Sequence, residues 1–384
     1  MKKLAILFAG TLLLLSVHAQ AQDYYVYVTA ESEDEVSLIK FDGTKTEIIE
    51  HKAVGIWPAE IEGPHGITVD PSGKYWYLSL AHGNPYGTLY KYTTGENQLV
   101  GKVELGLFPA SMQISKATGL LYCVNFNLHG DMVPSTVSVV DPEEMIELER
   151  ITTGVMPHGS RISPDGMKQY SVGMMSGELF EIDALGMKVS RKLMLDEKSD
   201  NSMKSSMDHS KMDHSDMNHS KMDHSMPDHS KIDHAKMNHS KTKPTWVMPH
   251  PDGKRAYVAG NGSNEILEID LKKWKVTDRW TTDKGPYNID VSPDGKRLVV
   301  SYKTAGKTGI WDLNSNKELA VIQNSNKVTH GVAISSDSRY AFVSVEGIGG
   351  DPGAMDVIDL ETNQLVTTAL LGKQAGGIAF WKVD

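Results

Sequence analysis

The sequence predicts an all-β protein in which seven four-stranded blades surround a central axis, the arrangement of a seven-bladed β-propeller. Three observations predict this fold. A strand–turn–strand phrase recurs along the chain, each end of the chain lacks strands that the other end supplies, and helical periodicity is absent over any useful length. A chain of 384 residues is long enough to bury the large core that such a fold needs.

The repeated phrase consists of a short strand, a tight turn and a returning strand rich in Tyr and Val. It recurs at intervals of about 40–50 residues once one long insert is set aside. In "SRISPDGMKQYSVG", "WVMPHPDGKRAYVAG" and "NIDVSPDGKRLVVSY" the turn is Pro-Asp-Gly. Pro fixes φ, Asp bonds to its own backbone and Gly accepts positive φ, so this turn suits a hairpin. A third strand ending near Asp follows, as in "ILEID" and "GIWDL", and then a fourth, which completes a propeller blade.

The repeats give six complete blades and two partial ends. The complete blades are expected at residues 64–106, 108–154, 156–196, 244–283, 285–325 and 328–372. At the N-terminus "DYYVYVTA", "EVSLIKF" and "KTEIIE" supply strands two to four of a seventh blade, and the C-terminal "KQAGGIAFWKVD" supplies its first strand. We therefore expect the C-terminal strand to pair with the N-terminal strands and close the ring, which removes exposed sheet edges.

Two stretches, "AYVAGNGSNEILEIDLKKWKVTDRW" and "SPDGKRLVVSY", resemble the YVTN-type seven-bladed propellers that bacteria commonly export. The likeness covers nearly the whole chain outside the insert and the N-terminal leader. It implies the propeller fold and leaves the function open, because that family includes binding proteins, surface proteins and the cofactor-bearing propellers of respiratory enzymes.

Residues 1–21 have the pattern of a cleavable secretory signal peptide. Lys2 and Lys3 precede an apolar run from residue 4 to residue 17, and Ala19-Gln20-Ala21 provides small residues at the cleavage site. The apolar run is too short for a comfortable transmembrane helix. We expect a mature chain of residues 22–384 with no membrane span after cleavage, located in the periplasm or secreted.

Charge and cysteine content exclude several classes of function. The formal net charge is −10, and removing Lys2 and Lys3 takes it to −12. An acidic chain without a basic stripe argues against nucleic-acid binding, which needs clustered Lys and Arg. Cys123 is the only cysteine, so an internal disulfide is impossible, and its apolar setting predicts a buried, inert thiol. The chain has no nucleophile elbow, phosphate-binding loop, zinc-protease helix or haem-attachment motif.

An insert at residues 198–243, between the third and fourth blades, is the most specific chemical signal. It repeats Met, Asp or Asn, His, Ser and a polar residue every five positions, a period that fits neither helix nor strand, so we expect a flexible loop. Thioethers favour Cu(I), imidazoles accept Cu(I), Cu(II), Zn(II) or Ni(II), and together they favour copper or silver. The candidate ligands are Met207, His209, Met212, His214, Met217, His219, Met222, His224, His229, His234, Met237 and His239.

The insert closely resembles the Met-Asp-His-Ser runs of periplasmic copper-resistance proteins, copper oxidases among them. That resemblance implies copper as the bound cofactor, as Cu(I) or Cu(II), with zinc or silver possible at the insert. It also implies a periplasmic copper carrier or redox partner. The alternative is a low-complexity solubilising linker whose His and Met content has no role.

Five histidines outside the insert are expected on one face of the propeller. Strands alternate in direction within a blade, so the start of the first strand and the end of the second lie on the same face, where the insert attaches. His65 ("GPHG"), His158 ("MPHG") and His330 ("VTHG") begin inner strands, and His82 and His129 follow second strands. The first three are expected at the mouth of the central channel.

Convergent imidazoles at a propeller axis are similar in type to the copper centres of nitrous oxide reductase and thiocyanate dehydrogenase. The full histidine set of those enzymes is not present, and neither is the Cys-bearing electron-transfer domain of nitrous oxide reductase. The alternative is that each histidine is a turn residue bonded to the backbone of a neighbouring blade. The two interpretations differ in geometry, since ligands must point at a common centre.

Three functions follow from these patterns. The first is a metal-handling propeller that captures copper with the insert and holds it or hands it on at the channel mouth. The second is a copper-dependent oxidoreductase, and the third is a propeller that docks proteins. The sequence favours the first, because its only strong signal is a binding signal.

Overall fold

The computed structural model describes residues 22–56, 60–82, 86–196 and 239–384. The predicted signal peptide therefore lies outside the described residues. So do all of the insert's candidate ligands except His239. Within the described residues, no helix is long and apolar enough to cross a membrane.

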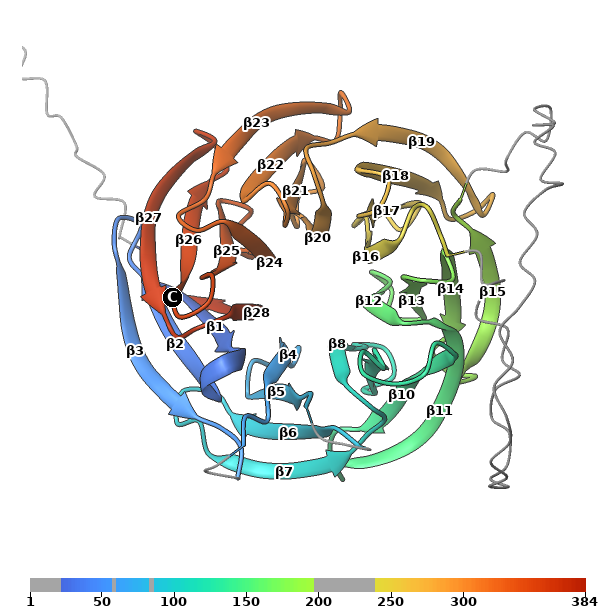
Figure 1. Ribbon diagram of the computed structural model, residues 1–384, viewed down its shortest axis with the longest axis horizontal. Helices are drawn as coiled ribbons and strands as arrows, with labels where there is room; N and C mark the ends of the chain where they lie inside the picture. The colour runs from blue at the N-terminus through green and yellow to red at the C-terminus, as the bar shows by residue number, and fades with distance from the viewer. Residues whose placement is uncertain (1–21, 57–59, 83–85, 197–238) are drawn as a thin grey trace, which may run out of the picture.

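Seven antiparallel four-stranded sheets surround a central axis, which confirms the predicted seven-bladed propeller (Figure 1). The first blade contains β4 (Pro64–Val69), β5 (Tyr75–Leu80), β6 (Thr88–Thr93) and β7 (Leu99–Glu104). The second contains β8 (Pro109–Ile114), β9 (Leu121–Asn125), β10 (Pro134–Asp141) and β11 (Ile146–Val155). The third contains β12 (Pro157–Ile162), β13 (Lys168–Gly173), β14 (Glu178–Asp183) and β15 (Lys188–Met194).

The remaining blades follow the same order from the axis outward. The fourth contains β16 (Pro244–Pro249), β17 (Arg255–Gly260), β18 (Glu265–Asp270) and β19 (Lys275–Thr281). The fifth contains β20 (Pro286–Val291), β21 (Arg297–Tyr302), β22 (Lys307–Asp312) and β23 (Lys317–Gln323). The sixth contains β24 (Val328–Ile334), β25 (Tyr340–Glu346), β26 (Gly353–Asp359) and β27 (Gln364–Leu371).

The seventh blade joins the two ends of the chain, as the strand deficit predicts. It contains β28 (Ala375–Val383), β1 (Tyr24–Ala30), β2 (Glu35–Phe41) and β3 (Thr46–Ala53), with β28 innermost. β28 pairs antiparallel with β1. Backbone hydrogen bonds of 3.2 and 2.9 Å join Asp23 to Asp384 in both directions. The ring is therefore closed by hydrogen bonds between the first and last described segments of the chain.

The turn between β4 and β5 shows why the repeated phrase forms hairpins. The side chain of Asp70 accepts hydrogen bonds from the backbone N–H groups of Lys74 and Tyr75. Gly73 takes a φ of +71°, which costs an L-residue with a Cβ more than it costs glycine. The Pro-Asp-Gly turns of the third, fourth and fifth blades place Gly166, Gly253 and Gly295 in the same region of φ.

The core lies between neighbouring blades and is built from alternating apolar residues. Trp76 of β5 is fully buried and stacks on Tyr27 of β1, with ring centroids 5.2 Å apart, so the first and seventh blades share aromatic packing. Cys123 of β9 is buried, and its burial raises the pKa of the thiol. The predicted inert thiol agrees with this setting.

The two ends of the insert are joined by one side chain. The carboxylate of Asp196 accepts hydrogen bonds from the Ser240 hydroxyl at 2.9 Å and from the Thr242 backbone N–H at 2.8 Å. Ser240 and Thr242 are buried. We call Asp196, Ser240 and Thr242 the insert clasp. It holds the start of the path into β16 against the end of the third blade.

Candidate metal centre at the channel mouth

The channel histidines occupy one structural position that repeats in every blade. Pairing with the second strand aligns Pro64, Pro157 and Thr329, each of which precedes a histidine. At the next position the seven inner strands carry His65, Ala110, His158, Thr245, Tyr287, His330 and Gly376. Three large polar rings and a tyrosine therefore share the mouth with smaller residues, which leave room for them to reach inward.

A glycine follows each of these histidines because the next inner strand lies against it. A Cβ on Gly66 would lie 1.8 Å from the carbonyl oxygen of Ala110, and one on Gly331 would lie 2.7 Å from that of Gly376. Gly159 has the same relation to Thr245. The strand pairing also shifts register across each histidine, and such an irregularity re-aims a side chain.

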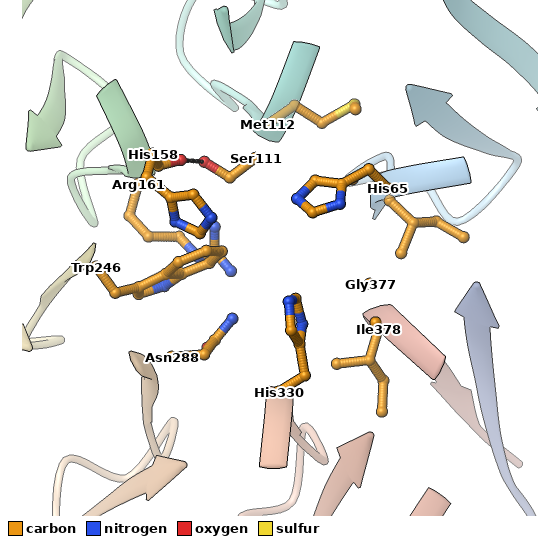
Figure 2. A pocket seen from close by; sticks show the side chains of 13 residues that line it. His65, Ser111, Met112, His158, Arg161, Trp246, Asn288, His330, Gly377 and Ile378 are labelled. Atoms are coloured by element: carbon orange, nitrogen blue, oxygen red, sulfur yellow. Dashed lines mark hydrogen bonds between the residues drawn. The ribbon is translucent and has the colours of Figure 1, made fainter. Parts of the chain in front are cut away.

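His65, His158 and His330 converge on one small cavity from three sides (Figure 2). The ring centroid of His65 lies 6.3 Å from that of His158 and 6.0 Å from that of His330. The cavity has a volume of about 40 Å³, and Trp246 and Asn288 also line it. The expectation that the three residues share the channel mouth agrees with this geometry.

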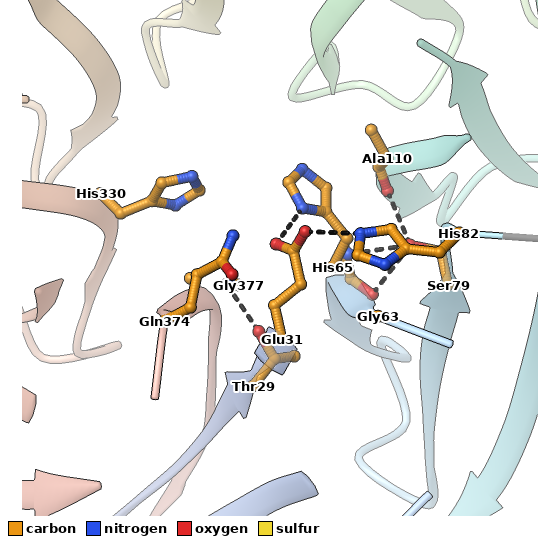
Figure 3. Close-up of polar contacts among 12 residues, drawn as sticks. Thr29, Glu31, Gly63, His65, Ser79, His82, Ala110, His330, Gln374 and Gly377 are labelled. Atoms are coloured by element: carbon orange, nitrogen blue, oxygen red, sulfur yellow. Dashed lines mark hydrogen bonds and ion pairs between the residues drawn. The ribbon is translucent and has the colours of Figure 1, made fainter. Parts of the chain in front are cut away.

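Glu31 holds His65 and His82 together (Figure 3). It lies in the short 3₁₀ helix η1 (Glu31–Glu33), and its buried carboxylate is 2.8 Å from Nδ1 of His65 and 3.0 Å from Nε2 of His82. A carboxylate only accepts, so both ring nitrogens donate. Burial alone would raise the pKa of Glu31, but the charge and hydrogen bonds of the two histidines outweigh burial and hold it well below its usual range.

The contact with Glu31 separates the roles of the two histidines. Because Nδ1 of His65 donates to Glu31, a neutral His65 ring carries its lone pair on Nε2, on the side of the cavity. In His82 the nitrogen Nε2 is turned to Glu31, and the hydrogen bond raises the pKa of the ring despite its partial burial. His82 is therefore placed to support Glu31 rather than to face the cavity.

His158 is fixed by two partners. Its Nδ1 lies 3.0 Å from the backbone oxygen of Thr245, so Nδ1 donates and Nε2 carries the lone pair. The hydroxyl of Tyr287 donates to that Nε2 at 2.7 Å. Burial lowers the pKa of His158 to about 3, with the charge of His65 adding to the effect, so the ring is neutral at physiological pH.

His330 is buried and incompletely hydrogen-bonded. Its Nδ1 has no hydrogen-bond partner among the described residues, and its Nε2 lies 3.7 Å from Oε1 of Glu346, which is beyond hydrogen-bond length. Glu346 instead pairs with Lys303 at 3.0 Å. Burial, together with the charge of Lys303, lowers the pKa of His330 well below its usual value. A buried ring nitrogen without a partner is costly and calls for an explanation.

Tyr287 stands between two of the histidines. Its ring centroid is 5.0 Å from that of His158 and 4.9 Å from that of His330. The ammonium group of Lys303 lies over its ring, 4.4 Å from the centroid. Burial raises the pKa of its hydroxyl, and the charge of Lys303 opposes that effect. The phenol is therefore a hydrogen-bond donor to His158 at physiological pH.

His129 and His239 lie further out. His129 is exposed, and its ring centroid is 6.5 Å from that of His82 and 5.7 Å from that of Phe108. His239 is exposed next to the insert clasp. In the part of the chain that the structure describes, no three His, Cys, Asp or Glu side chains are close enough to hold a metal ion without some movement.

Glu31 and Tyr287 are not among the site residues that the sequence predicts. Tyr287 follows Pro286 as His65 follows Pro64, so aligning the fifth blade with the first would have placed it at the mouth. Glu31 follows β1, the second strand of its blade, just as His82 follows β5. The rule that placed His82 on this face therefore also places Glu31 there.

A family model described as YNCE-like beta-propeller matches residues 249–339. The chain is a β-propeller protein. The matched segment begins at the last residue of β16 and covers most of the fourth blade, the fifth blade and the first strand of the sixth. No curated protein matches the propeller in the sequence comparison.

Several solved structures share the propeller's fold. A periplasmic gluconolactonase of Pseudomonas aeruginosa, PpgL, is similar with a TM-score of 0.68 and 13% identity, over 94% of this chain and 99% of that one. Hydrazine synthase of Kuenenia stuttgartiensis gives a TM-score of 0.63 and 17% identity, over 85% and 93%. A functionally unknown protein from Desulfotomaculum acetoxidans gives 0.67 and 13%, over 93% and 99%. At these identities the likeness concerns the fold alone.

Proposed function

We propose that this propeller is an exported copper-binding protein, with His65, His158 and His330 as the ligands at the channel mouth. The observation that carries the proposal is the convergence of three imidazoles on one small cavity, from three different blades. The Met/His-rich insert is proposed to capture copper, and the channel mouth to hold it or hand it on. Export rests on the signal-peptide pattern of residues 1–21.

The spacing of the rings supports the proposal. A metal–nitrogen bond of about 2.0 Å places imidazole centroids about 5–5.5 Å apart around a three- or four-coordinate metal. The measured separations are 6.0 and 6.3 Å. An inward movement of about 1 Å would therefore bring His65 to bonding geometry with His158 and with His330, and Tyr287, which lies between His158 and His330, would have to move for those two rings to approach each other.

The hydrogen bonds around the rings also suit a metal site. Ligand histidines commonly donate their other ring N–H to a carboxylate or a backbone carbonyl, which fixes the tautomer. His65 has that relation to Glu31, and His158 has it to the carbonyl of Thr245. For His158 to bind a metal through Nε2, the hydroxyl of Tyr287 must first release that nitrogen.

Copper is the first choice of metal because both the imidazoles of the channel mouth and the thioethers of the insert bind it. Imidazole nitrogens accept Cu(I), Cu(II) and Zn(II), whereas the thioethers of the insert favour Cu(I) and Ag(I) and are poor zinc ligands. The insert clasp ends at Thr242, three residues before Thr245, which in turn accepts a hydrogen bond from His158. The C-terminal end of the insert is therefore attached beside the proposed site.

Metal analysis of variants tests the proposal. The chain lacking residues 199–238, loaded with copper and desalted, should retain about one copper per chain, and His330→Gln should abolish that retention. His51→Gln, on the outer strand β3 and exposed, is the matched control and should retain copper. Equal copper in the His330→Gln and His51→Gln proteins would disprove a site at the channel mouth.

A further inference from the structure

The channel continues beyond the histidine cavity into a larger chamber of about 230 Å³. The chamber is lined by residues from the middle and far ends of the inner strands, and it shares Ile67, Met112, Arg161 and Ile378 with the histidine cavity. A cavity of about 150 Å³ accommodates benzene, so this chamber has room for a molecule the size of an amino acid.

Two opposite charges face the chamber without pairing with each other. Arg161 of β12 donates to the backbone oxygen of Ser160 at 2.8 Å and lies over the ring of Trp246, 4.6 Å from guanidinium carbon to ring centroid. Asp290 of β20 accepts the backbone N–H groups of Val291 and Ile334, each at 3.0 Å. Within the described residues, neither side chain forms a salt bridge, so most of the guanidinium's donors and the remaining lone pairs of the carboxylate stay open to a ligand.

The rest of the chamber wall combines apolar residues with the polar side chains of Thr68 and Gln113. Val69 of β4, Val332 and Ile334 of β24, and Ile378 and Phe380 of β28 line it. An apolar ligand would bury both side chains with no oppositely charged group in direct contact with either, which is costly. Asp290 would repel a simple anion, and Arg161 would repel a simple cation. A ligand that interacts favourably with Arg161, with Asp290 and with the apolar residues carries a negative group, a hydrogen-bond donor and an apolar body.

We propose that this chamber binds a small α-amino or α-hydroxy acid with an apolar side chain. The ligand's carboxylate accepts hydrogen bonds from Arg161, whose planar guanidinium suits bidentate recognition of a carboxylate. The neighbouring ammonium or hydroxyl donates to Asp290. The apolar side chain packs against Val332 and Phe380. None of the three proposed metal ligands lines this chamber, although Arg161 lines both cavities, and the proposal does not depend on copper.

Isothermal titration calorimetry with leucine and its truncated analogues tests the site. Leucine carries both polar groups, 4-methylpentanoate lacks the ammonium, and 3-methylbutylamine lacks the carboxylate. The chain from Gln22 onward should bind leucine about tenfold or more tightly than either analogue, because each analogue leaves one buried charge unpaired. Equal affinity for the three compounds, or no binding of leucine, would overturn the proposal.

Two variants should change the ligand preference in different ways. Arg161→Gln should weaken the binding of both leucine and 4-methylpentanoate by about tenfold or more. Asp290→Asn should weaken the binding of leucine, whose ammonium loses its charged partner. It should strengthen the binding of 4-methylpentanoate, because it removes a negative charge from the surroundings of the ligand's carboxylate. Arg150→Gln, on the outer strand β11 and exposed, is the matched control and should bind as the parent does. If Asp290→Asn weakened the binding of leucine and of 4-methylpentanoate equally, the assigned role of Asp290 would be wrong.

Discussion

The glycine after each channel histidine determines how closely two neighbouring blades approach. Gly66→Ala would place a Cβ 1.8 Å from the backbone oxygen of Ala110, and neither backbone can move without disturbing a sheet. We expect the substitution to lower the free energy of unfolding by on the order of 3 kcal/mol. Gly350→Ala, at an exposed position with no atom within 4 Å, should change it by less than about 0.5 kcal/mol. Urea denaturation of both variants measures the contrast, and similar losses would contradict the explanation.

Without bound metal, the hydroxyl of Tyr287 donates a hydrogen bond to Nε2 of His158. In Tyr287→Phe the buried Nε2 of His158 loses its donor, so the metal-free chain should be less stable by about 1–3 kcal/mol. Bound copper would occupy that nitrogen, so the rise in melting temperature on adding copper should be larger in the variant than in the parent. Thermal melts with and without copper measure both effects. An equal copper-induced rise in the two proteins would show that His158 is not a ligand.

Asp290 makes stability depend on pH in a defined direction. Burial raises the pKa of its carboxyl to about 6, although the charge of Arg161 opposes the shift. The unfolded value is about 3.9, so ionisation disfavours the folded state progressively as pH rises from about 4 through 6. Asp290→Asn removes this titration. The stability of the variant relative to the parent should therefore rise by about 2 kcal/mol between pH 4.5 and 7.5. A pH-independent difference would be inconsistent with a raised pKa.

Residue-level prediction from the sequence succeeded where the repeat register decided the outcome. His65, His158 and His330 begin equivalent inner strands, and the alternation of strand direction is enough to place them on one face. The same register could not reveal which ring nitrogens carry lone pairs. That depends on Glu31 and on the Thr245 carbonyl, which come from neighbouring blades and are joined to the histidines only by tertiary packing.

At the scale of single elements, the insert clasp predicts that the insert is dispensable for folding. Asp196 already joins Ser240 and Thr242, so removing residues 199–238 shortens a connection and leaves every strand of the seven blades in place. The shortened chain should melt within a few degrees of the parent and should lose most of its weakly held Cu(I). Circular dichroism and a Cu(I) competition titration measure the two properties. Retention of all the Cu(I) would rule out capture by the insert.

The strands were predictable because each is short, alternates apolar with polar residues and is bounded by residues that favour turns. The six complete blades begin and end within a few residues of their expected limits. The 3₁₀ helix η1 was not predicted, since three residues between two strands leave no periodic signal. That short turn places Glu31 in the channel, so the smallest element of the fold supplies a central residue of the candidate site.

At the scale of the whole molecule, the seventh blade determines whether the ring is closed. Removing residues 375–384 deletes β28 and leaves β1 without its inner partner. Because folded domains are stable by only about 5–15 kcal/mol, we expect the truncated chain to lose cooperative unfolding. A synthetic peptide of residues 375–384 should restore it in part, by adding a strand to the open edge. Thermal melts with and without the peptide measure this, and a truncated chain that melts like the parent would contradict it.

The hydrogen bonds between Asp23 and Asp384 also have a consequence for the timing of biosynthesis. A ribosome makes β28 after every other strand of the seven blades, so the closed ring cannot exist until residues 375–384 have been made. Blades one to six can assemble in order as they emerge, whereas β1, β2 and β3 are made first and must wait for their fourth strand. For a chain that is exported, as proposed, this delay keeps the propeller open, and therefore easier to unfold for passage through a membrane, until β28 has been made.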